Sequence, residues 1–170
     1  MRITRDQWAI EMAQVTAKRS TCMRRAVGCV LLNDFGHVLS TGYNGVARGR
    51  PHCNQPEFVR RIETGLGFPF PPVIELPNNF THACSGSKAE SGTNLDACQA
   101  IHAEQNALLQ CRDVYQIAVA YVTASPCITC TKLLLNTSCQ RIVFVEEYPQ
   151  PEARQLWVDS GRLWQKYGEA

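Results

Sequence analysis

Hydrophobic periodicity near the start of the chain predicts one helix followed by a hairpin. Apolar residues recur at helical spacing between residues 6 and 19, with charged residues on another side. Residues 26–33 form an apolar, β-branched run that is typical of a buried strand, and residues 37–43 predict a second strand. Because residues 33–36 read Asn-Asp-Phe-Gly and favour a turn, the two strands are expected to pair.

The second half of the chain alternates between helix and strand patterns. Helices are predicted over residues 96–111, 126–137 and 151–160, and strands over residues 116–124, 141–146 and 162–167. Strands that alternate with helices are joined by right-handed crossovers and run parallel. Together with the antiparallel hairpin they predict a three-layer α/β/α fold with a mixed sheet of about five strands.

Residues 46–95 show no clear periodicity, because prolines and glycines interrupt them. A long irregular segment within a compact domain needs a reason to be ordered. Residues 1–170 are therefore expected to form a single domain with an irregular insertion around residues 55–81. That insertion, rich in proline and aromatic residues, could cover a pocket, contact a neighbouring subunit or alter effector binding.

Composition narrows the classes of function. The 170 residues fit one domain, and a net charge of +2 is too small to indicate nucleic-acid binding. We expect neither a secretory signal nor a membrane span, because no apolar run is long enough for a span and none follows the first basic residues. Nine cysteines without such a signal indicate reduced thiols, some of them on metal, in a cytoplasmic protein.

Two short motifs hold the candidate chemistry. His102 lies two residues before Glu104, and Cys127 follows Pro126 and lies three residues before Cys130. Imidazole and thiolates are ligands that zinc prefers, and three of them leave the fourth tetrahedral position for water, as in catalytic zinc sites. Zinc lowers the pKa of bound water to about 7, and a neighbouring carboxylate can then carry protons. This H-x-E…P-C-x-x-C pattern is the known signature of zinc nucleobase deaminases.

The proton carrier of such a reaction would be Glu104. It would protonate the ring N3 of an aminopyrimidine while activated water attacks C4, and it would then protonate the departing amino group. Ammonia leaves and a carbonyl remains. The alternative is a closed structural zinc site with Glu104 on a helix surface. Two motifs that each open a predicted helix, with a strand between them, favour the catalytic interpretation.

Residues 100–108 and 125–130, which contain these motifs, resemble the cytidine and deoxycytidylate deaminase superfamily. Residues 19–28, 41–45 and 146–149 narrow the resemblance to the dCMP deaminases of bacteria and phages. It implies the cytidine deaminase fold and zinc-dependent conversion of dCMP to dUMP for thymidylate synthesis. It also implies a homo-oligomer, often a hexamer, regulated by dCTP and dTTP, in the cytoplasm (the host's if phage-encoded).

The resemblance implies roles around a bound nucleotide. His102, Cys127 and Cys130 match zinc ligands and Glu104 the proton shuttle. Asn44 matches the residue that holds the sugar and orients the base, although an Asn beside glycines is also a common turn residue.

Backbone groups and an aromatic ring complete the implied nucleotide site. The backbone N–H of Ala103, free at a helix N-terminus, would contact the base carbonyl. Ser125 would bring backbone near the leaving amine. Tyr148 would line the pocket or else pack at a strand end. Arg24 and Arg25 could bind the phosphate of substrate or effector, since guanidinium suits phosphate, or could be solvated surface charges.

Four further cysteines suggest a second metal. Cys22, Cys53, Cys84 and Cys98 match the places of cysteines in bacterial dCMP deaminases, which implies a structural zinc; His52 or His82 could replace one of them. A closed four-ligand zinc would also stabilise an irregular segment with little core. The alternative is scattered buried thiols. The remaining cysteines are expected in the core: Cys29, Cys111 and Cys139.

Other functions remain open at the level of sequence. A tRNA adenosine deaminase or another base deaminase is disfavoured by the weak net charge and by residues 42–45 together with Cys22. A 5-methyl- or 5-hydroxymethyl-dCMP substrate would change only the pocket wall near C5. A regulatory module that binds nucleotides without turnover is disfavoured by Glu104, since a binder has no use for a proton shuttle.

Overall fold

The computed structural model describes residues 1–49, 52–53, 86 and 98–169, so the insertion predicted around residues 55–81 lies outside the described residues. Before residue 50 the elements are α1 (Arg5–Ala17), β1 (Gly28–Leu32), β2 (Val38–Tyr43) and β3 (Gly45–Val46). After residue 97 they are β4 (Ala100–Ile101), α2 (Ala103–Gln110), the 3₁₀ helix η3 (Val114–Gln116), β5 (Val119–Ala124), α3 (Ile128–Leu135), β6 (Arg141–Glu146), α4 (Pro151–Asp159) and β7 (Leu163–Lys166).

The central sheet has five strands in the order β2-β1-β5-β6-β7. Strand β1 runs antiparallel to both β2 and β5, whereas β5, β6 and β7 are parallel to one another. The hairpin and the two crossovers through α3 and α4 therefore confirm the predicted mixed sheet. Because β5 and β6 are parallel, their carboxyl ends lie at the same edge of the sheet.

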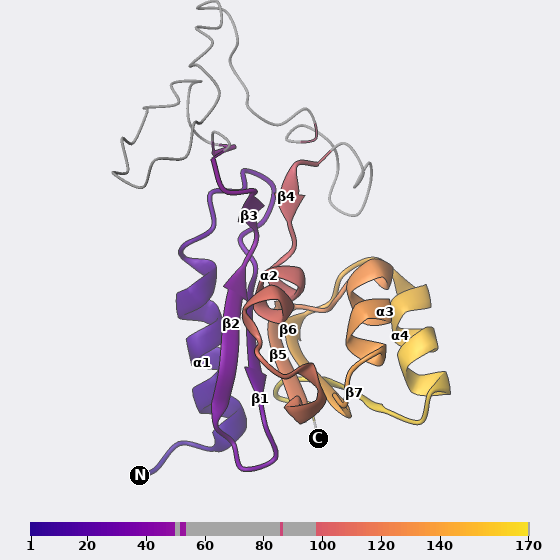
Figure 1. Cartoon of the computed structure of the whole chain (residues 1–170). Helices are drawn as coiled ribbons and strands as arrows, with labels where there is room; N and C mark the ends of the chain where they lie inside the picture. Colours follow the sequence, from indigo (N-terminus) through magenta and orange to yellow (C-terminus); the bar gives the residue numbers. More distant parts are fainter. Residues whose placement is uncertain (50–51, 54–85, 87–97, 170) are drawn as a thin grey trace, which may run out of the picture.

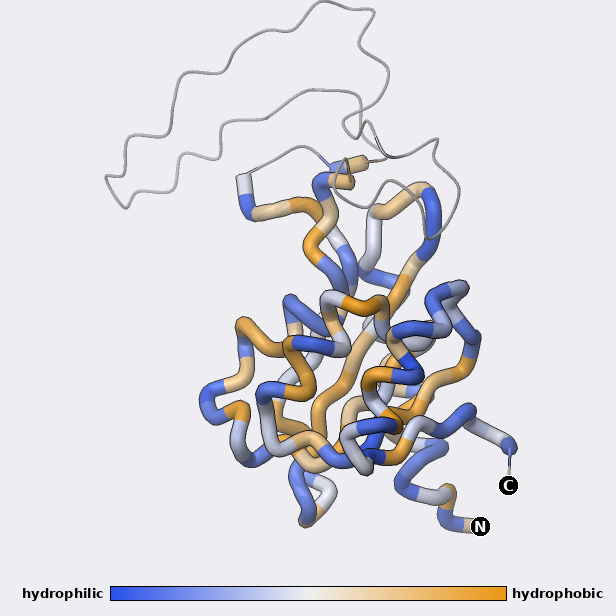
Figure 2. The backbone as a smooth tube through the Cα atoms, turned by 90° about the vertical axis from the view of Figure 1, so that its right-hand side faces the viewer, coloured by the Kyte–Doolittle hydropathy of each residue, from blue (hydrophilic) through white to orange (hydrophobic). Residues whose placement is uncertain are grey.

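Side chains that alternate along the strands divide the core into two layers. On β1, Val30 and Leu32 face α1, whereas Cys29 and Leu31 face the side of α2, α3 and α4. The strands β5 and β6 alternate in the same way. Figure 1 shows α1 on one side of the sheet and α3 and α4 on the other. In Figure 2 the hydrophobic stretches run through the middle of the molecule.

Helix α2 packs closely on β2 at Gly42. A Cβ atom at this position would collide with the carbonyl oxygen of Ala103 and the backbone nitrogen of Ala107. Nearby, Ser40 Oγ donates to the Ala107 carbonyl at 2.8 Å, and Asn106 Nδ2 donates to the Tyr43 carbonyl at 2.8 Å. The missing side chain of Gly42 thus lets β2 hold the first turns of α2 in place.

The predicted helix over residues 96–111 begins too early. Residues 96–97 lie outside the described part, Ala100 and Ile101 are extended, and α2 starts at Ala103. Ala100 and Ile101 pair with Val46 and Gly45 of β3, forming a small second sheet (Figure 1). Pairing with a distant segment overrides the helical pattern here, and it makes His102 the residue that caps α2.

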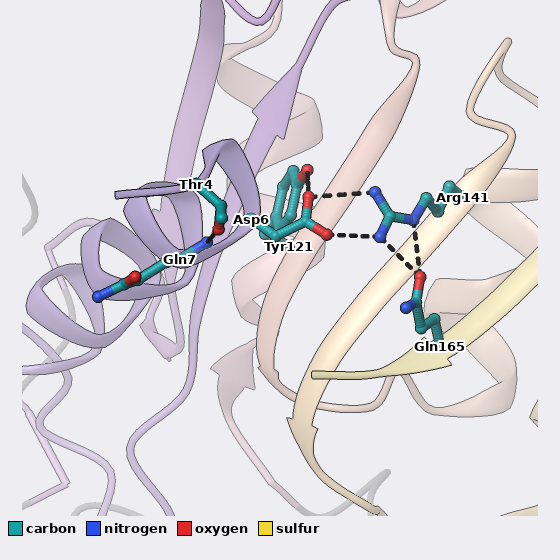
Figure 3. Close-up of polar contacts among 6 residues, drawn as sticks. All are labelled: Thr4, Asp6, Gln7, Tyr121, Arg141 and Gln165. Carbon is teal, nitrogen blue, oxygen red and sulfur yellow. Dashed lines mark hydrogen bonds and ion pairs between the residues drawn. The ribbon is translucent and has the colours of Figure 1, made fainter. Parts of the chain in front are cut away.

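A polar network fastens α1 to the sheet on the face away from α2 (Figure 3). Asp6 accepts hydrogen bonds from Tyr121 Oη at 2.6 Å and from Arg141 Nη1 and Nη2 at 3.1 and 2.6 Å. Gln165 Oε1 in turn accepts from Arg141 Nε and Nη2 at 3.0 and 2.6 Å. One network therefore joins α1, β5, β6 and β7.

Among the described residues no helix is long and apolar enough to cross a membrane.

Candidate active site

Two helix N-termini bring three metal-binding side chains together. His102 is the N-cap residue of α2, Cys127 is the N-cap residue of α3, and Cys130 lies in the first turn of α3. His102 Nδ1 is 3.4 Å from the Sγ atoms of both cysteines. The three ligand atoms lie within 4.8 Å of one another, the sole such group of three or more found in the described part of the chain. A donor set of one imidazole nitrogen and two thiols fits zinc with a position left open.

Hydrogen bonds to neighbouring backbone fix both turns. Gln105 Oε1 accepts from the backbone N–H of His102 at 2.9 Å, which holds the start of α2. Gln150, in the loop after β6, accepts from the Ile128 N–H at 2.9 Å, directly after Cys127. A support of this kind orients ligands without binding the metal itself. No sequence pattern indicates Gln150, because its role depends on the adjacency of β5 and β6.

The two cysteines share protons unequally. Hydrogen bonds from Cys130 and His102 lower the pKa of Cys127 to about 4, although burial opposes them. The hydrogen bond to Cys127 and burial raise the pKa of Cys130, and the hydrogen bond to Cys127 raises that of His102. One thiolate is therefore already favoured at neutral pH, and zinc would displace the remaining proton, because the metal binds thiolates.

Glu104 is a buried carboxyl group beside this cluster. It lies in the first turn of α2, and only 4% of its surface is exposed. Burial raises its pKa to about 7, while its own backbone N–H and His102 act in the opposite direction. A carboxyl group with a pKa near neutrality can both accept and donate a proton, which is the property that general acid–base catalysis requires.

The cluster opens into one cavity of about 580 Å³, a volume that includes open solvent. The residues that line it are Cys22, Arg24, Arg25, Val27, Asn44, Cys98, Ala100, His102, Ala103, Glu104, Ala124, Ser125, Cys127 and Tyr148. Every substrate or phosphate residue proposed from the sequence is among them. Val27, Ala100 and Ala124 were missed, because apolar residues at strand ends show no chemical pattern.

Asn44 holds the loop before β1 as well as lining the cavity. Its Oδ1 accepts from the Val27 N–H at 2.8 Å, and its Nδ2 donates to the Arg25 carbonyl at 2.8 Å. Ser125 has a similar position in the loop after β5. Its Oγ accepts from the Tyr148 N–H at 2.8 Å. Both residues therefore fix the backbone around the cavity, whatever they contact in a ligand.

The cysteines expected to hold a second metal do not form a second cluster in the described part of the chain. Cys22 and Cys98 line the active-site cavity, and Cys53 is buried. Cys84 lies outside the described residues. By contrast, the expected core cysteines are confirmed: Cys29 and Cys139 are fully buried in the core, and the partly buried Cys111 packs against it.

A three-layer fold that brings a three-ligand zinc site beside a buried carboxylate defines the class of zinc-dependent deaminases. A family model agrees: residues 3–146 match the cytidine and deoxycytidylate deaminase zinc-binding region. The chain therefore belongs to this family, as a member that resembles the dCMP deaminases.

Named relatives give the same result. The chain is 34% identical to a deoxycytidylate deaminase of Schizosaccharomyces pombe. The aligned region covers 84% of this chain but only 37% of that protein's length. It is 33% identical to a deoxycytidylate deaminase of Mycobacterium phage D29, over 84% of this chain and 94% of that one. The solved structure of a dCMP deaminase from cyanophage S-TIM5 in complex with dCMP and dUMP has a TM-score of 0.65 at 19% identity, over 98% of both chains. This last likeness shows the shared fold.

Proposed function

We propose that the chain catalyses the zinc-dependent hydrolysis of dCMP to dUMP and ammonia. The observation that carries the proposal is the buried Glu104 beside the group formed by His102, Cys127 and Cys130, in a cavity that also contains two arginines. The relatives named deoxycytidylate deaminase support the choice of substrate.

A zinc ion held by His102, Cys127 and Cys130 would supply a water molecule activated for addition to C4 of the cytosine ring. Glu104 takes up a proton from that water and gives it to N3; it then takes the second proton from the hydroxyl group on C4 and gives it to the departing amino group. The sum of these steps is dCMP plus water giving dUMP plus ammonia. Burial of Glu104 keeps these proton transfers within the site.

The remaining proposed contacts orient the nucleotide. The Ala103 N–H, at the start of α2, donates to the base carbonyl. Asn44 contacts the sugar, Ser125 brings backbone to the leaving amine, and Tyr148 lines the nucleotide pocket. Arg24 and Arg25, on the same cavity, are the proposed phosphate ligands.

A substrate panel tests the function. The zinc-loaded chain is given dCMP, 5-methyl-dCMP, CMP, dCTP and deoxycytidine, and both absorbance and released ammonia are measured, with and without added dCTP or dTTP. We expect the highest kcat/KM with dCMP. Turnover of none of these compounds would contradict the proposal, and faster turnover of 5-methyl-dCMP would reassign the substrate.

A second zinc and a homo-oligomer, a hexamer by resemblance, belong to the same proposal. Elemental analysis of the folded chain is expected to give two zinc ions per chain, and Cys130→Ser should remove one of them. One zinc per chain in the wild type would contradict the second site. Light scattering measures the subunit number, and its response to dCTP or dTTP tests whether these effectors change the assembly.

A further inference from the structure

An ion pair lies against the wall of the active-site cavity. Arg25 lines the cavity, and its Nη1 lies 3.6 Å from Glu146 Oε2. The guanidinium carbon lies 5.6 Å from the centre of the Tyr148 ring. The Arg25 side chain is 30% exposed and that of Glu146 is 68% exposed. The arginine is therefore held in the pocket wall, while its carboxylate partner reaches it from solvent.

The ion pair leaves Arg25 incompletely satisfied. A separation of 3.6 Å is too long for a hydrogen bond. Nη1 is buried, and none of the described residues accepts a hydrogen bond from it. A buried donor without an acceptor is unfavourable, so this atom favours an additional anionic group.

The backbone on both sides of the pair is fixed. Asn44 Nδ2 donates to the Arg25 carbonyl at 2.8 Å, which anchors the loop before β1. The Ser125 N–H donates to the Glu146 carbonyl at 2.8 Å, and Ser125 Oγ accepts from the Tyr148 N–H at 2.8 Å. The backbone of Arg25 is thus anchored at the cavity, and Glu146 has the more exposed side chain of the pair.

We propose that Glu146 is an internal counter-ion of Arg25, which the anionic group of a nucleoside monophosphate displaces on binding. This inference rests on the proposed nucleotide function. Glu146 then sets how strongly the pocket distinguishes a phosphorylated ligand from a neutral nucleoside. Its role is to position and to tune Arg25; it does not take part in the chemical step.

Physical chemistry gives the direction of the competition. An exposed carboxylate gains little from pairing with arginine and is hydrated again when displaced. A phosphate makes shorter, charge-assisted and bidentate contacts with guanidinium. Glu146 consequently weakens the binding of every anionic ligand that reaches Arg25, and it leaves neutral ligands unaffected.

The test compares Glu146→Gln with the wild type, both zinc-loaded. The Kd values of dUMP and of deoxyuridine are measured by calorimetry at one low ionic strength. The Kd of dUMP should fall about two- to fivefold, the range of an exposed ion pair, and that of deoxyuridine should not change. Glu147→Gln is the matched control, because Glu147 is also exposed and forms none of the ion pairs found among the described residues.

A chain without the Arg25 charge distinguishes displacement of the counter-ion from simple repulsion between Glu146 and the phosphate of the ligand. If Glu146 acts through Arg25, Glu146→Gln should have no effect on dUMP binding in a chain that already contains Arg25→Gln. Weaker dUMP binding in Glu146→Gln, an equal change for deoxyuridine, or a full effect without Arg25 would each overturn the proposal.

If the wild type turns over dCMP but Glu146→Gln does not lower the Kd of dUMP, the counter-ion role alone is overturned. The shift in a chain that lacks turnover overturns the proposed function alone, and absence of dUMP binding by the wild type overturns both.

Discussion

Glu104 is the single residue whose chemical form matters most to the proposed reaction. Glu104→Gln keeps the size and the burial of the side chain but removes its ability to carry a proton. We expect ammonia release from dCMP to fall at least about 100-fold, because general acid–base catalysis contributes roughly that much or more. Zinc content and dUMP affinity should stay at wild-type values, as measured by elemental analysis and calorimetry.

The control for this substitution is Glu152→Gln, which removes an exposed carboxylate in the first turn of α4. It should retain wild-type turnover. Ammonia release by Glu104→Gln at the wild-type rate would refute the assigned proton carrier. Loss of zinc together with activity would instead assign Glu104 a role in holding the metal site.

At the scale of elements, the contact between α2 and β2 decides where His102 and Glu104 lie. Gly42→Ala places a methyl group against the backbone of α2, at Ala103 and Ala107. We expect the free energy of unfolding to fall by about 1–3 kcal/mol, the usual effect of overpacking. Urea unfolding at pH 7 measures it, and turnover should fall as well, because α2 must shift.

Gly45→Ala is the matched control for this close approach. A Cβ atom at Gly45 would meet only the Tyr43 ring, at 3.6 Å or more, which is an ordinary contact. This variant should therefore unfold close to the wild type. If the two variants lost equal stability, the effect would come from backbone flexibility rather than from the packing of α2 on β2.

The elements that the sequence predicts well are those with local causes. The five strands of the sheet follow from apolar runs and alternation, and the group of His102, Cys127 and Cys130 follows from short spacings at helix starts. The pairing of β4 with β3 has no local pattern, so the predicted helix over residues 96–111 began too early.

The contacts that support the site could not be predicted from the sequence for the same reason, because they depend on which strands lie side by side. Gln150 reaches Ile128, and Glu146 reaches Arg25, only because β6 lies beside β5 and β5 lies beside β1. No spacing along the chain encodes such neighbours. Sequence patterns therefore identify the metal-binding group, whereas the residues that orient it depend on strand order.

At the scale of the whole molecule, the network around Asp6 joins α1 to three strands of the sheet. Burial raises the pKa of Asp6, but hydrogen bonds from Arg141 and Tyr121 outweigh it and hold that pKa below its usual value. Burial and the hydrogen bond to Asp6 raise the pKa of Tyr121, so its hydroxyl remains a donor. The charged form of Asp6 is therefore the form that stabilises the fold.

This charge makes stability depend on pH in a defined direction. Because the pKa of Asp6 is lower in the folded than in the unfolded chain, its stabilisation is complete above about pH 4, the ordinary range of aspartate, and is lost as the pH falls through the folded value. Asp6→Asn should lower the free energy of unfolding at pH 7 by about 1.5–3 kcal/mol, the range for hydrogen bonds to a charged group. Urea unfolding at pH 7 and pH 3 should show this difference shrink at the lower pH. Glu11→Gln, which removes an exposed charge from the same helix, should show no comparable loss, and a difference for Asp6→Asn that did not vary with pH would contradict the role of the charge.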